Sequence, residues 1–531
     1  MNFDFIVVGA GSAGCVLANR LSADPRYKVA VIEAGGKDSS PWIHIPVGYF
    51  KTMGNPKTDW QYHTEPDPGL NGRSISWPRG KVLGGSSSIN GLLYVRGQAE
   101  DYDGWRQLGN AGWGWEDVFP YFKRAETWAN GGDDYRGGDG PLQVSPTRLT
   151  RQVVDDWIDA AENAGYKKNP DYNGADQEGV GYFQLTTKNG KRCSSAVAYL
   201  HPVKDRKNLE IFTNAQVEGL TFEGKRVTGV KVRIKGQLQE IKANREVVLS
   251  SGAIGSPQLL MTSGIGAAED LKPHGIEVRH ELKGVGKNLQ DHLQARPVYK
   301  VNVPTINTEI GNIFKQGMIG LQYMWNRTGP MTMAASLGTG FLKTRPELAT
   351  PDIQFHIQPF SADKPADGPH KFSAFTASVL QMRPESAGHL ELTSSDMRDY
   401  PKIHPNYLAT KLDCDTIVDG IRIARNIAKQ EPLKSIITEE HGPGDHIADD
   451  DYDAILNWAR DTAVTIYHPT GTCKMGNDPN GVVDERLRVH GIEGLRIADC
   501  SIMPIIVSGN TNAPAIMIGE KTSDMILEDV R

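Results

Sequence analysis

The sequence predicts an α/β protein in which a Rossmann-like nucleotide-binding domain is joined to a second, α+β domain with an antiparallel sheet. Three observations support this fold class. A glycine-rich turn separates two short apolar strands at the start of the chain, and the pattern of apolar residues changes near residue 150. In addition, a chain of 531 residues is too long for one hydrophobic core.

The first element is a complete βαβ unit of the dinucleotide-binding kind. Residues 3–8 and 29–32 are short apolar runs typical of buried strands, and residues 15–22 have the pattern of a helix. The first strand and the helix are joined by Gly9-Ala10-Gly11-Ser12-Ala13-Gly14. We expect Gly9 to make the tight turn, Gly11 to let a pyrophosphate approach the backbone, and Gly14 to let helix and strand pack closely.

A bound nucleotide would find two further partners in this unit. The helix N-terminus that follows the glycine turn attracts phosphate. Glu33 lies 24 residues after Gly9, at the end of the second strand. It would accept hydrogen bonds from the adenosine ribose, which disfavours a 2′-phosphate and therefore NADP. The turn alone does not distinguish FAD from NAD, so an NAD-dependent dehydrogenase is an alternative here.

The rest of the chain mixes helix and strand patterns. Residues 153–161 have one apolar helical face, which Gly165 could end. Residues 227–234, 246–249, 353–357 and 389–393 resemble strands, and Ile417, Ile421, Ala424 and Ile427 share one face of an amphipathic helix. We predict a discontinuous first domain of residues 1–150, 205–300 and 460–531. Residues 151–204 and 301–459 would form the second, substrate-binding domain.

Composition excludes several classes of protein. The net charge of −6 and the lack of a basic stripe give no sign of nucleic-acid binding. The five cysteines are scattered without metal-type spacing, which favours reduced thiols and predicts no metal site. No signal peptide or membrane-spanning run is evident, so we expect a cytoplasmic protein, with peripheral contact to the inner face of the membrane left open.

Two more segments indicate a family. One is Gly80-Lys81-Val82-Leu83-Gly84-Gly85-Ser86-Ser87-Ser88-Ile89-Asn90; the other runs from Gly252 to Gly266 and contains Ser256-Pro257, which is typical of a helix start. Both resemble the signature patterns of the glucose–methanol–choline (GMC) flavoprotein oxidoreductases, and the resemblance spans essentially the whole chain. It implies an FAD-binding domain of the GMC type and an FAD-dependent alcohol oxidation.

Several residues would then contact FAD. The Gly84-Gly85-Ser86-Ser87 turn offers backbone N–H groups that suit a pyrophosphate or a flavin edge, and Asn90 could hydrogen-bond the isoalloxazine. The resemblance implies that Val217 contacts the adenine through its backbone. It also implies that Asp499 and Asn512 lie near the ribityl chain and the flavin ring.

The resemblance further implies a catalytic pair. His468 lies in Tyr467-His468-Pro469-Thr470-Gly471, where the family carries its base, and Asn512 lies where it carries a second active-site residue, Asn or His. An alcohol is a very weak acid, so a base must take the hydroxyl proton while the hydride moves to flavin N5. Neutral imidazole can do this near pH 7, and an amide N–H can hold the same oxygen.

Departures from the family limit the substrate. Ile89 cannot form the histidine–FAD bond of some choline-oxidising relatives, so we expect noncovalent FAD. Leu337 replaces the glutamate that choline-handling members carry before a Gly-x-Gly-Phe-like stretch, so we expect an uncharged or polyol-like primary alcohol. Choline dehydrogenase and an oxygen-using alcohol oxidase are the alternatives, and a flavoprotein without activity is another. We expect a quinone or redox protein as electron acceptor; the alcohol and the oligomeric state stay open.

Overall fold

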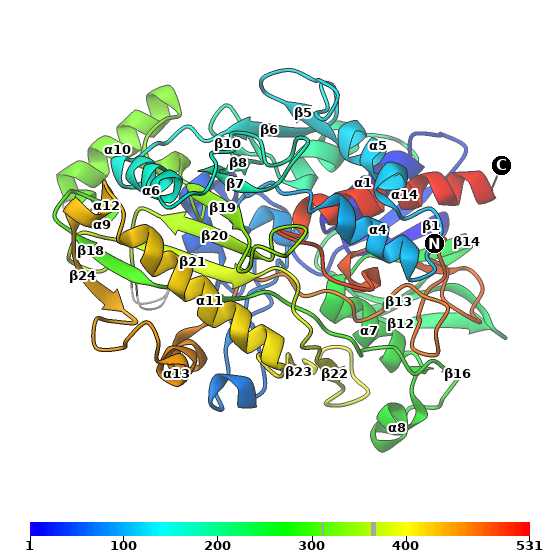
Figure 1. The fold of residues 1–531 in the computed structure, drawn as a ribbon. Helices are drawn as coiled ribbons and strands as arrows, with labels where there is room; N and C mark the ends of the chain where they lie inside the picture. Colours follow the sequence, from blue (N-terminus) through cyan, green and yellow to red (C-terminus); the bar gives the residue numbers. More distant parts are fainter. Residues whose placement is uncertain (311–312, 363–367, 531) are drawn as a thin grey trace.

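The computed structural model describes residues 1–310, 313–362 and 368–530, and its core is built on two large sheets (Figure 1). In the described chain the first sheet runs in the order β11-β2-β1-β14-β13-β12, with β26 paired to β14. The strands are β1 (Asn2–Val8), β2 (Val29–Ile32), β11 (Leu209–Phe212), β12 (Ala215–Glu223), β13 (Arg226–Ile234), β14 (Gln237–Leu249) and β26 (Leu495–Ile497). Strands β11, β2, β1, β14 and β26 are parallel, as in a Rossmann-like sheet. Their buried runs, such as Val29-Ala30-Val31-Ile32, are typical of a sheet that is covered on both faces.

Helices cover this sheet on the side of the first glycine turn. Helix α1 (Ser12–Leu21) follows β1 directly, and α14 (Asn512–Asp529) packs against it although the two lie at opposite ends of the chain (Figure 1). Glu520 of α14 forms an ion pair with Arg20 of α1 at 2.7 Å, which fixes the C-terminal helix beside α1. Helices α4 (Ala99–Gln107), α5 (Trp115–Ala125) and α7 (Gly252–Thr262) belong to the same half of the molecule.

The second sheet is antiparallel throughout its described strands. Its order is β24-β18-β21-β20-β19-β7, with β17 paired to β21 and β25. The strands are β7 (Gly179–Tyr182), β17 (Leu293–Ala295), β18 (Val298–Val301), β19 (Gly338–Leu342), β20 (Ile353–Gln358), β21 (Ala374–Gln381), β24 (Ile437–Gly442) and β25 (Val464–Thr465).

Helices α6 (Gln152–Asn163) and α11 (Lys411–Ala428) cover one face of the second sheet. Close packing explains glycines in both layers. A Cβ at Gly340 of β19 would lie 3.1 Å from the Trp157 ring of α6, and a Cβ at Gly420 of α11 would lie 2.8 Å from Val379 of β21. The opposite face of the sheet is therefore the one left to line a site.

The remaining elements are short or peripheral. The strands are β3 (Tyr62–His63), β4 (Ser76–Trp77), β5 (Glu126–Trp128), β6 (Leu142–Pro146), β8 (Gln184–Leu185), β9 (Thr187–Lys188), β10 (Lys191–Arg192), β15 (Ile265–Gly266), β16 (His280–Glu281), β22 (His389–Glu391) and β23 (Lys402–His404). The helices are α2 (Pro41–His44), α3 (Tyr49–Thr52), α8 (Ala268–Leu271), α9 (Ile306–Glu309), α10 (Ile313–Asn326), α12 (Leu433–Ile436) and α13 (Tyr452–Thr462). No helix among the described residues is long and apolar enough to cross a membrane.

The fold class and the main elements are confirmed, with two differences in detail. Strands β17, β18 and β25 belong to the second sheet, although residues 205–300 and 460–531 were predicted for the first domain. Their backbone pairing with β21, β24 and one another decides this, and short strands give no such signal in sequence. Helix α7 begins at Gly252, four residues before the predicted Ser256. The Gly252 N–H donates to Asp499 at 2.9 Å, which stabilises the earlier start.

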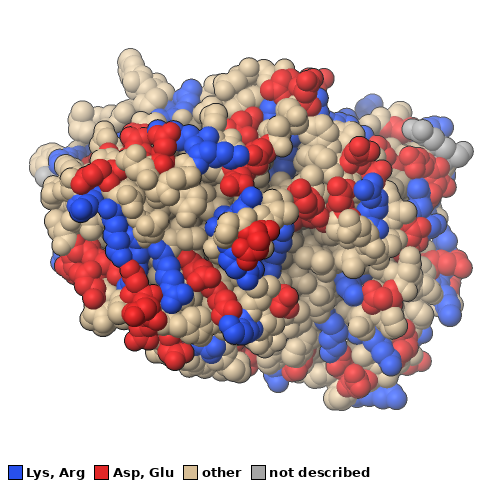
Figure 2. All heavy atoms as spheres, viewed as in Figure 1, with Lys and Arg blue, Asp and Glu red and all other residues tan. Residues whose placement is uncertain are grey.

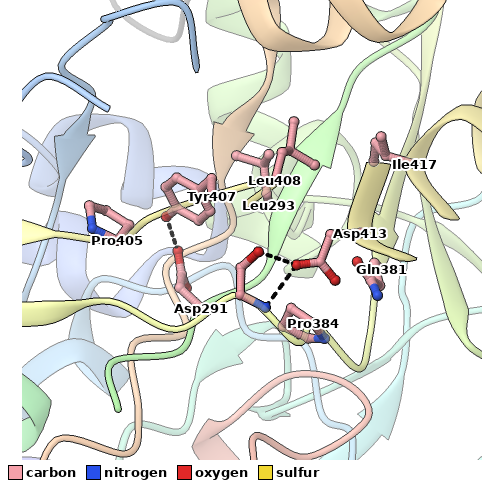
Figure 3. Close-up of a pocket in the computed structure, with 10 residues that line it drawn as sticks. Asp291, Leu293, Gln381, Pro384, Pro405, Tyr407, Leu408, Asp413 and Ile417 are labelled. Atoms are coloured by element: carbon pink, nitrogen blue, oxygen red, sulfur yellow. Dashed lines mark hydrogen bonds between the residues drawn. The ribbon is translucent and has the colours of Figure 1, made fainter. Parts of the chain in front are cut away.

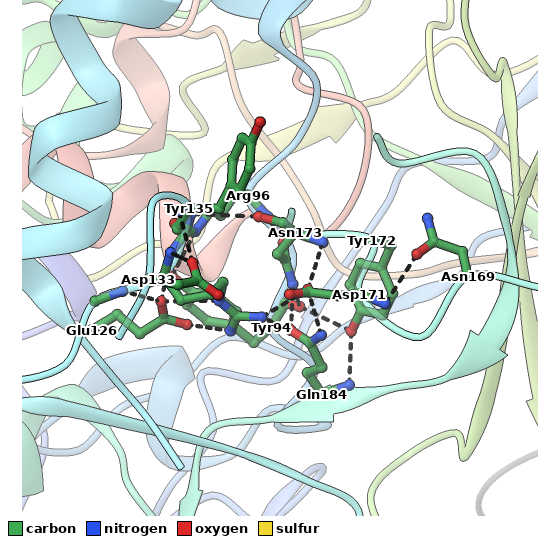
Figure 4. Close-up of polar contacts among 12 residues, drawn as sticks. Tyr94, Arg96, Glu126, Asp133, Tyr135, Asn169, Asp171, Tyr172, Asn173 and Gln184 are labelled. Carbon is green, nitrogen blue, oxygen red and sulfur yellow. Dashed lines mark hydrogen bonds and ion pairs between the residues drawn. The ribbon is translucent and has the colours of Figure 1, made fainter. Parts of the chain in front are cut away.

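A buried ionic network joins the segments around the site (Figure 4). The Glu126 carboxylate accepts hydrogen bonds from both Arg96 and Arg136, and all three side chains are at most 1% exposed. Arg136 also pairs with Asp171 at 2.8 Å. Because a buried charge without its partner is strongly unfavourable, these contacts hold the segment that follows the second glycine turn in place.

Candidate active site

The first glycine turn has the backbone that the sequence predicts. Gly9 has φ +99°, and a Cβ on Gly14 would lie 1.9 Å from the Gly9 carbonyl oxygen, so packing within the chain requires both glycines. Gly11 is different, because a Cβ there would meet nothing closer than 3.7 Å. Its lack of a side chain is explained by a group outside the chain approaching the backbone, as a pyrophosphate would.

The start of α1 is open to an anion. Gly11 is its N-cap residue, and no side chain caps the first turn. Ser12 Oγ donates to Asn512 Oδ1 at 2.8 Å, so the first residue of α14 lies beside the first residue of α1. Glu33 accepts hydrogen bonds from the N–H groups of Ala10 and Gly35, and burial raises the pKa of Glu33 to about 7.

The second glycine turn packs directly on the first. Gly84 and Gly85 have φ +89° and +53°, and a Cβ on Gly85 would lie 2.7 Å from Gly11 Cα. Ser86 Oγ accepts from the Gly80 N–H at 3.1 Å, which closes the turn on itself. The structure therefore brings both predicted phosphate-contacting turns to one place.

A buried arginine, which the sequence did not single out, holds this turn. Arg192 is 2% exposed and donates to the carbonyl oxygens of Ile43, Ser87 and Asn90, and to Asn90 Oδ1 at 2.6 Å. Within the described chain no carboxylate lies within ion-pair distance of its guanidinium, and burial lowers the pKa of Arg192 to about 9. Asn90 thus has a fixed orientation beside an uncompensated positive charge.

The other two predicted FAD contacts lie at the same end of the first sheet. Val217 is buried in β12, two residues after Ala215, whose N–H donates to the Glu33 carbonyl oxygen at 2.9 Å. Asp499 accepts from Ser256 Oγ and from the N–H groups of Gly252 and Ser501. Uncapped N–H groups, the open approach at Gly11 and the acceptor Glu33 fit the diphosphate and adenosine of FAD.

His468 is the base candidate, and its hydrogen bonds fix its tautomer. His292 Nε2 lies 2.8 Å from the Met382 carbonyl oxygen, which can only accept, so this nitrogen carries the proton. In neutral His292 the other nitrogen, Nδ1, is then an acceptor. It lies 3.0 Å from His468 Nδ1, which must therefore be the donor. His468 Nε2 is left without a proton, so its lone pair can accept one.

Asn510 lies at this nitrogen, and Asn512 does not. Asn510 Nδ2 is 3.1 Å from His468 Nε2, and Gln354 Nε2 donates to Asn510 Oδ1 at 3.4 Å, which orients the amide. The expected pairing of His468 with Asn512 thus differs from the structure. Asn512 begins α14 and contacts Ser12, so the helix start turns its side chain towards the glycine turn.

Burial keeps the histidines of the site neutral. It lowers the pKa of His468 well below its ordinary value, with neighbouring His292, His356 and Arg79 adding to the effect. Burial likewise lowers the pKa of His292 to about 4 and of His356 to about 3. Neutral imidazole is the form that accepts a proton.

Asp291 anchors the backbone of the base. Its Oδ1 accepts from the His468 N–H at 2.7 Å, and its Oδ2 accepts from Thr465 Oγ1 and the Tyr407 hydroxyl. Figure 3 shows this aspartate at the edge of a pocket that neither His468 nor Asn510 lines. Asp413 and Ser386, which hydrogen-bond each other, line the same pocket.

Alternating residues place polar side chains near His468 on the side of the second sheet that faces away from α6 and α11. We call Thr339, Gln354, His356, Gln358 and Ser378 the polar face. Each has a buried side-chain atom without a hydrogen-bond partner in the described chain: Thr339 Oγ1, Gln354 Oε1, His356 Nε2, Gln358 Oε1 and Ser378 Oγ. Buried polar atoms are normally paired, so these groups suit a polar ligand or water.

One group of metal-ligand types lies apart from these residues. His389, Glu391 and His404 on the β22–β23 hairpin have candidate ligand atoms within 4.8 Å of one another, and all three are partly exposed. His389 already contacts Glu391 at 3.1 Å. Neither the base nor the glycine turns supplies a residue to this group.

Comparison with known proteins agrees with this geometry. Models of the GMC oxidoreductase family match residues 3–294 and 384–519. The mitochondrial choline dehydrogenase of Mus musculus is 44% identical over 99% of this chain and 89% of its own. An alcohol dehydrogenase (acceptor) of Pseudomonas putida is 43% identical over 99% of this chain and 96% of its own.

Solved structures give the same result. A pyridoxine 4-oxidase from Mesorbium loti superposes with a TM-score of 0.89 at 30% identity, covering 98% of each chain. A formate oxidase superposes with a TM-score of 0.91 at 28% identity, covering 99% of this chain and 98% of its own. From its sequence, its fold and the geometry of its site, the chain belongs to the GMC oxidoreductase family and is an FAD-dependent oxidoreductase.

Proposed function

We propose that the protein oxidises a primary alcohol, uncharged or polyol-like, to the aldehyde, with His468 as the base. The observation that carries this proposal is the series of contacts from the Met382 carbonyl oxygen through His292 to His468 Nδ1, which leaves Nε2 of His468 without a proton. The hydrogen bond from Nδ1 to His292 keeps this nitrogen an acceptor, and burial keeps the ring neutral. A base of this kind is what the removal of a hydroxyl proton needs.

Each residue then has one task. His468 Nε2 takes the hydroxyl proton, and Asn510 donates its amide N–H to the same oxygen as negative charge develops there. FAD, when bound, supplies the acceptor for the carbinol hydride at flavin N5. His292 positions the base by fixing its tautomer, and Asp291 fixes its backbone.

The polar face supports a neutral substrate. Its free atoms belong to amides, hydroxyls and one imidazole, which can hold the hydroxyls of an alcohol or polyol. Leu337 is fully buried in the core, and it is the neighbouring Ser336 that contacts His356 at 3.4 Å. A cation such as choline is bound by a carboxylate or an aromatic cage, and neither Leu337 nor Ser336 supplies one.

Choline dehydrogenase is the second candidate, because similarity supports it as well as it supports the alcohol dehydrogenase. Choline dehydrogenases from Mus musculus and Homo sapiens are 44% and 43% identical to this chain, about as similar as the alcohol dehydrogenase of Pseudomonas putida. Oxidation of an alcohol with oxygen as acceptor is a third, because several choline dehydrogenases at 41% identity are described as oxygen-dependent. We favour a quinone or other redox acceptor.

We also propose that FAD is held without a covalent bond. Ile89, beside the predicted flavin contact Asn90, is 3% exposed and packs with Ile43 and Val82 in a small apolar cluster. An aliphatic side chain has no nucleophile for a bond to the flavin. The noncovalent contacts would come from both glycine turns, Glu33 and Asp499.

An anaerobic alcohol screen tests the substrate proposal. The FAD-loaded protein is mixed without oxygen with neutral primary alcohols, with polyols and with choline, and bleaching of the flavin band is recorded. We expect saturable bleaching by neutral alcohols or polyols. Saturable bleaching by choline alone would select choline dehydrogenase instead. Admitting air or a quinone after reduction then compares the two acceptors by their reoxidation rates.

A further inference from the structure

Helix α10 carries a row of large apolar side chains in contact with solvent. Phe314 is 82% exposed, Met318 66%, Leu321 56% and Trp325 89%. These four residues are three or four positions apart, so they share one face of the helix. Met324, 69% exposed, adjoins them. We call these five residues the apolar row.

The helix is attached by its opposite side. Tyr323 is 5% exposed and donates its hydroxyl to the Gly190 carbonyl oxygen at 3.0 Å. The apolar row therefore points away from the protein. In Figure 2 the surface over α10, at the upper left, includes a projecting uncharged portion. Apolar side chains exposed singly are ordinary, but a contiguous group on one helix face marks an interaction surface.

Basic residues adjoin the C-terminal end of the same helix. Arg148 Nη1 donates to the Arg327 carbonyl oxygen at 3.0 Å, and the turn between β9 and β10 packs against Arg327. That hairpin contributes Lys188 and Lys191, both exposed. We call these four residues the basic collar; in the described chain, no carboxylate lies within ion-pair distance of any of them.

The local charge is opposite to the overall charge. The protein carries a net −6, yet residues 141–154, 179–204 and 310–346 contain no Asp or Glu. These are the segments that supply the apolar row and the basic collar. An apolar helix face bordered by lysine and arginine complements a bilayer surface with anionic headgroups.

We propose that the apolar row and the basic collar dock the protein on an anionic bilayer, with α10 lying in the plane of the headgroups. The helix has 14 residues, or about 21 Å at 1.5 Å per residue, too short for a hydrocarbon core of about 30 Å. A second copy of the chain is the other possible occupant of an apolar face, but it would leave the adjoining positive charge without a partner of opposite sign. The proposal rests on the proposed function in one respect: if the electron acceptor is a quinone, a lipid-soluble quinone would be available where the protein docks.

Vesicle flotation tests this surface. FAD-loaded protein is mixed with vesicles of phosphatidylcholine alone or of phosphatidylcholine and phosphatidylglycerol in a 3:1 ratio. We expect flotation with the anionic vesicles. The triple variant Met318→Ser, Leu321→Ser, Trp325→Ser should lose about tenfold or more of that binding. Lys188→Glu with Lys191→Glu should also release the protein, and raised salt should weaken binding.

The control and the readouts separate the possible outcomes. Leu238→Ser removes an apolar side chain that is 52% exposed on β14, a strand of the first sheet far from α10 in sequence. This control variant should float like the wild type. Equal flotation of the wild type and the triple variant would overturn the proposal, as would a wild type that does not bind. A dimer in light scattering that the triple variant abolishes would assign the surface to a second copy. Alcohol oxidation with a water-soluble dye is measured in parallel, so loss of the function and loss of docking are distinguished.

Discussion

Replacing His292 by Phe tests whether this residue positions the base. The substitution removes the acceptor of the His468 Nδ1–H, which lies 3.0 Å away in a buried setting. A buried donor left unpaired costs about 1–3 kcal/mol. If that penalty falls on the reactive tautomer, the rate of flavin reduction drops about 5- to 160-fold. The tautomer with a proton on Nε2, which cannot take the hydroxyl proton, becomes more populated.

The assay is anaerobic stopped-flow reduction of the bound flavin over a range of pH. His292→Asn is the matched variant, because its Oδ1 can still accept from His468 Nδ1, and it should recover part of the lost rate. The pH profile of His292→Phe should also shift, since a merely structural change would lower the rate without moving the profile. A His292→Phe enzyme with the wild-type rate and pH profile would show that His292 does not position the base.

Four further outcomes follow from the structure. Asn510→Ala should slow flavin reduction about 10- to 100-fold, whereas Asn512→Ala should mainly lower FAD retention. If instead Asn512→Ala slowed reduction and Asn510→Ala lowered FAD retention, Asn512 would be the partner of His468. Glu126→Gln leaves two buried arginines short of charge and should lower the free energy of unfolding in urea by about 3–5 kcal/mol; an unchanged midpoint would contradict the network. Because burial lowers the pKa of His468 below 6.5, the reduction rate should stay level from pH 6.5 upward and fall only at more acidic pH. Heat precipitation should leave the yellow FAD in the supernatant, and flavin in the pellet would indicate a covalent bond.

The sequence predicted the elements that depend on local backbone geometry and burial. Gly9 and Gly14 have no room for a side chain, so the turn can be recognised from residue types alone. Apolar runs predicted β1 and β2, because the strands of a sheet covered on both faces consist largely of apolar residues. The position of Asn510 could not be predicted, because two asparagines stand two residues apart where α14 begins, and only the helix start decides which one turns towards His468.

Long-range contacts explain the other omissions. His292 was not among the predicted site residues, and its contact with His468 spans 176 residues. Arg192 gave no signal, because its partners are mainly backbone carbonyl oxygens, which any residue offers. The exposed row on α10 has the composition of a core helix, and only the exposed fractions of its side chains in the folded protein distinguish it.

The role of His468 is tested most directly by one rate. His468→Ala is loaded with FAD, its flavin content is matched to the wild type, and anaerobic flavin reduction is followed with the best alcohol from the screen. We expect the rate to fall about 100- to 10,000-fold, as it does when a general base is removed. Reduction at close to the wild-type rate would contradict it.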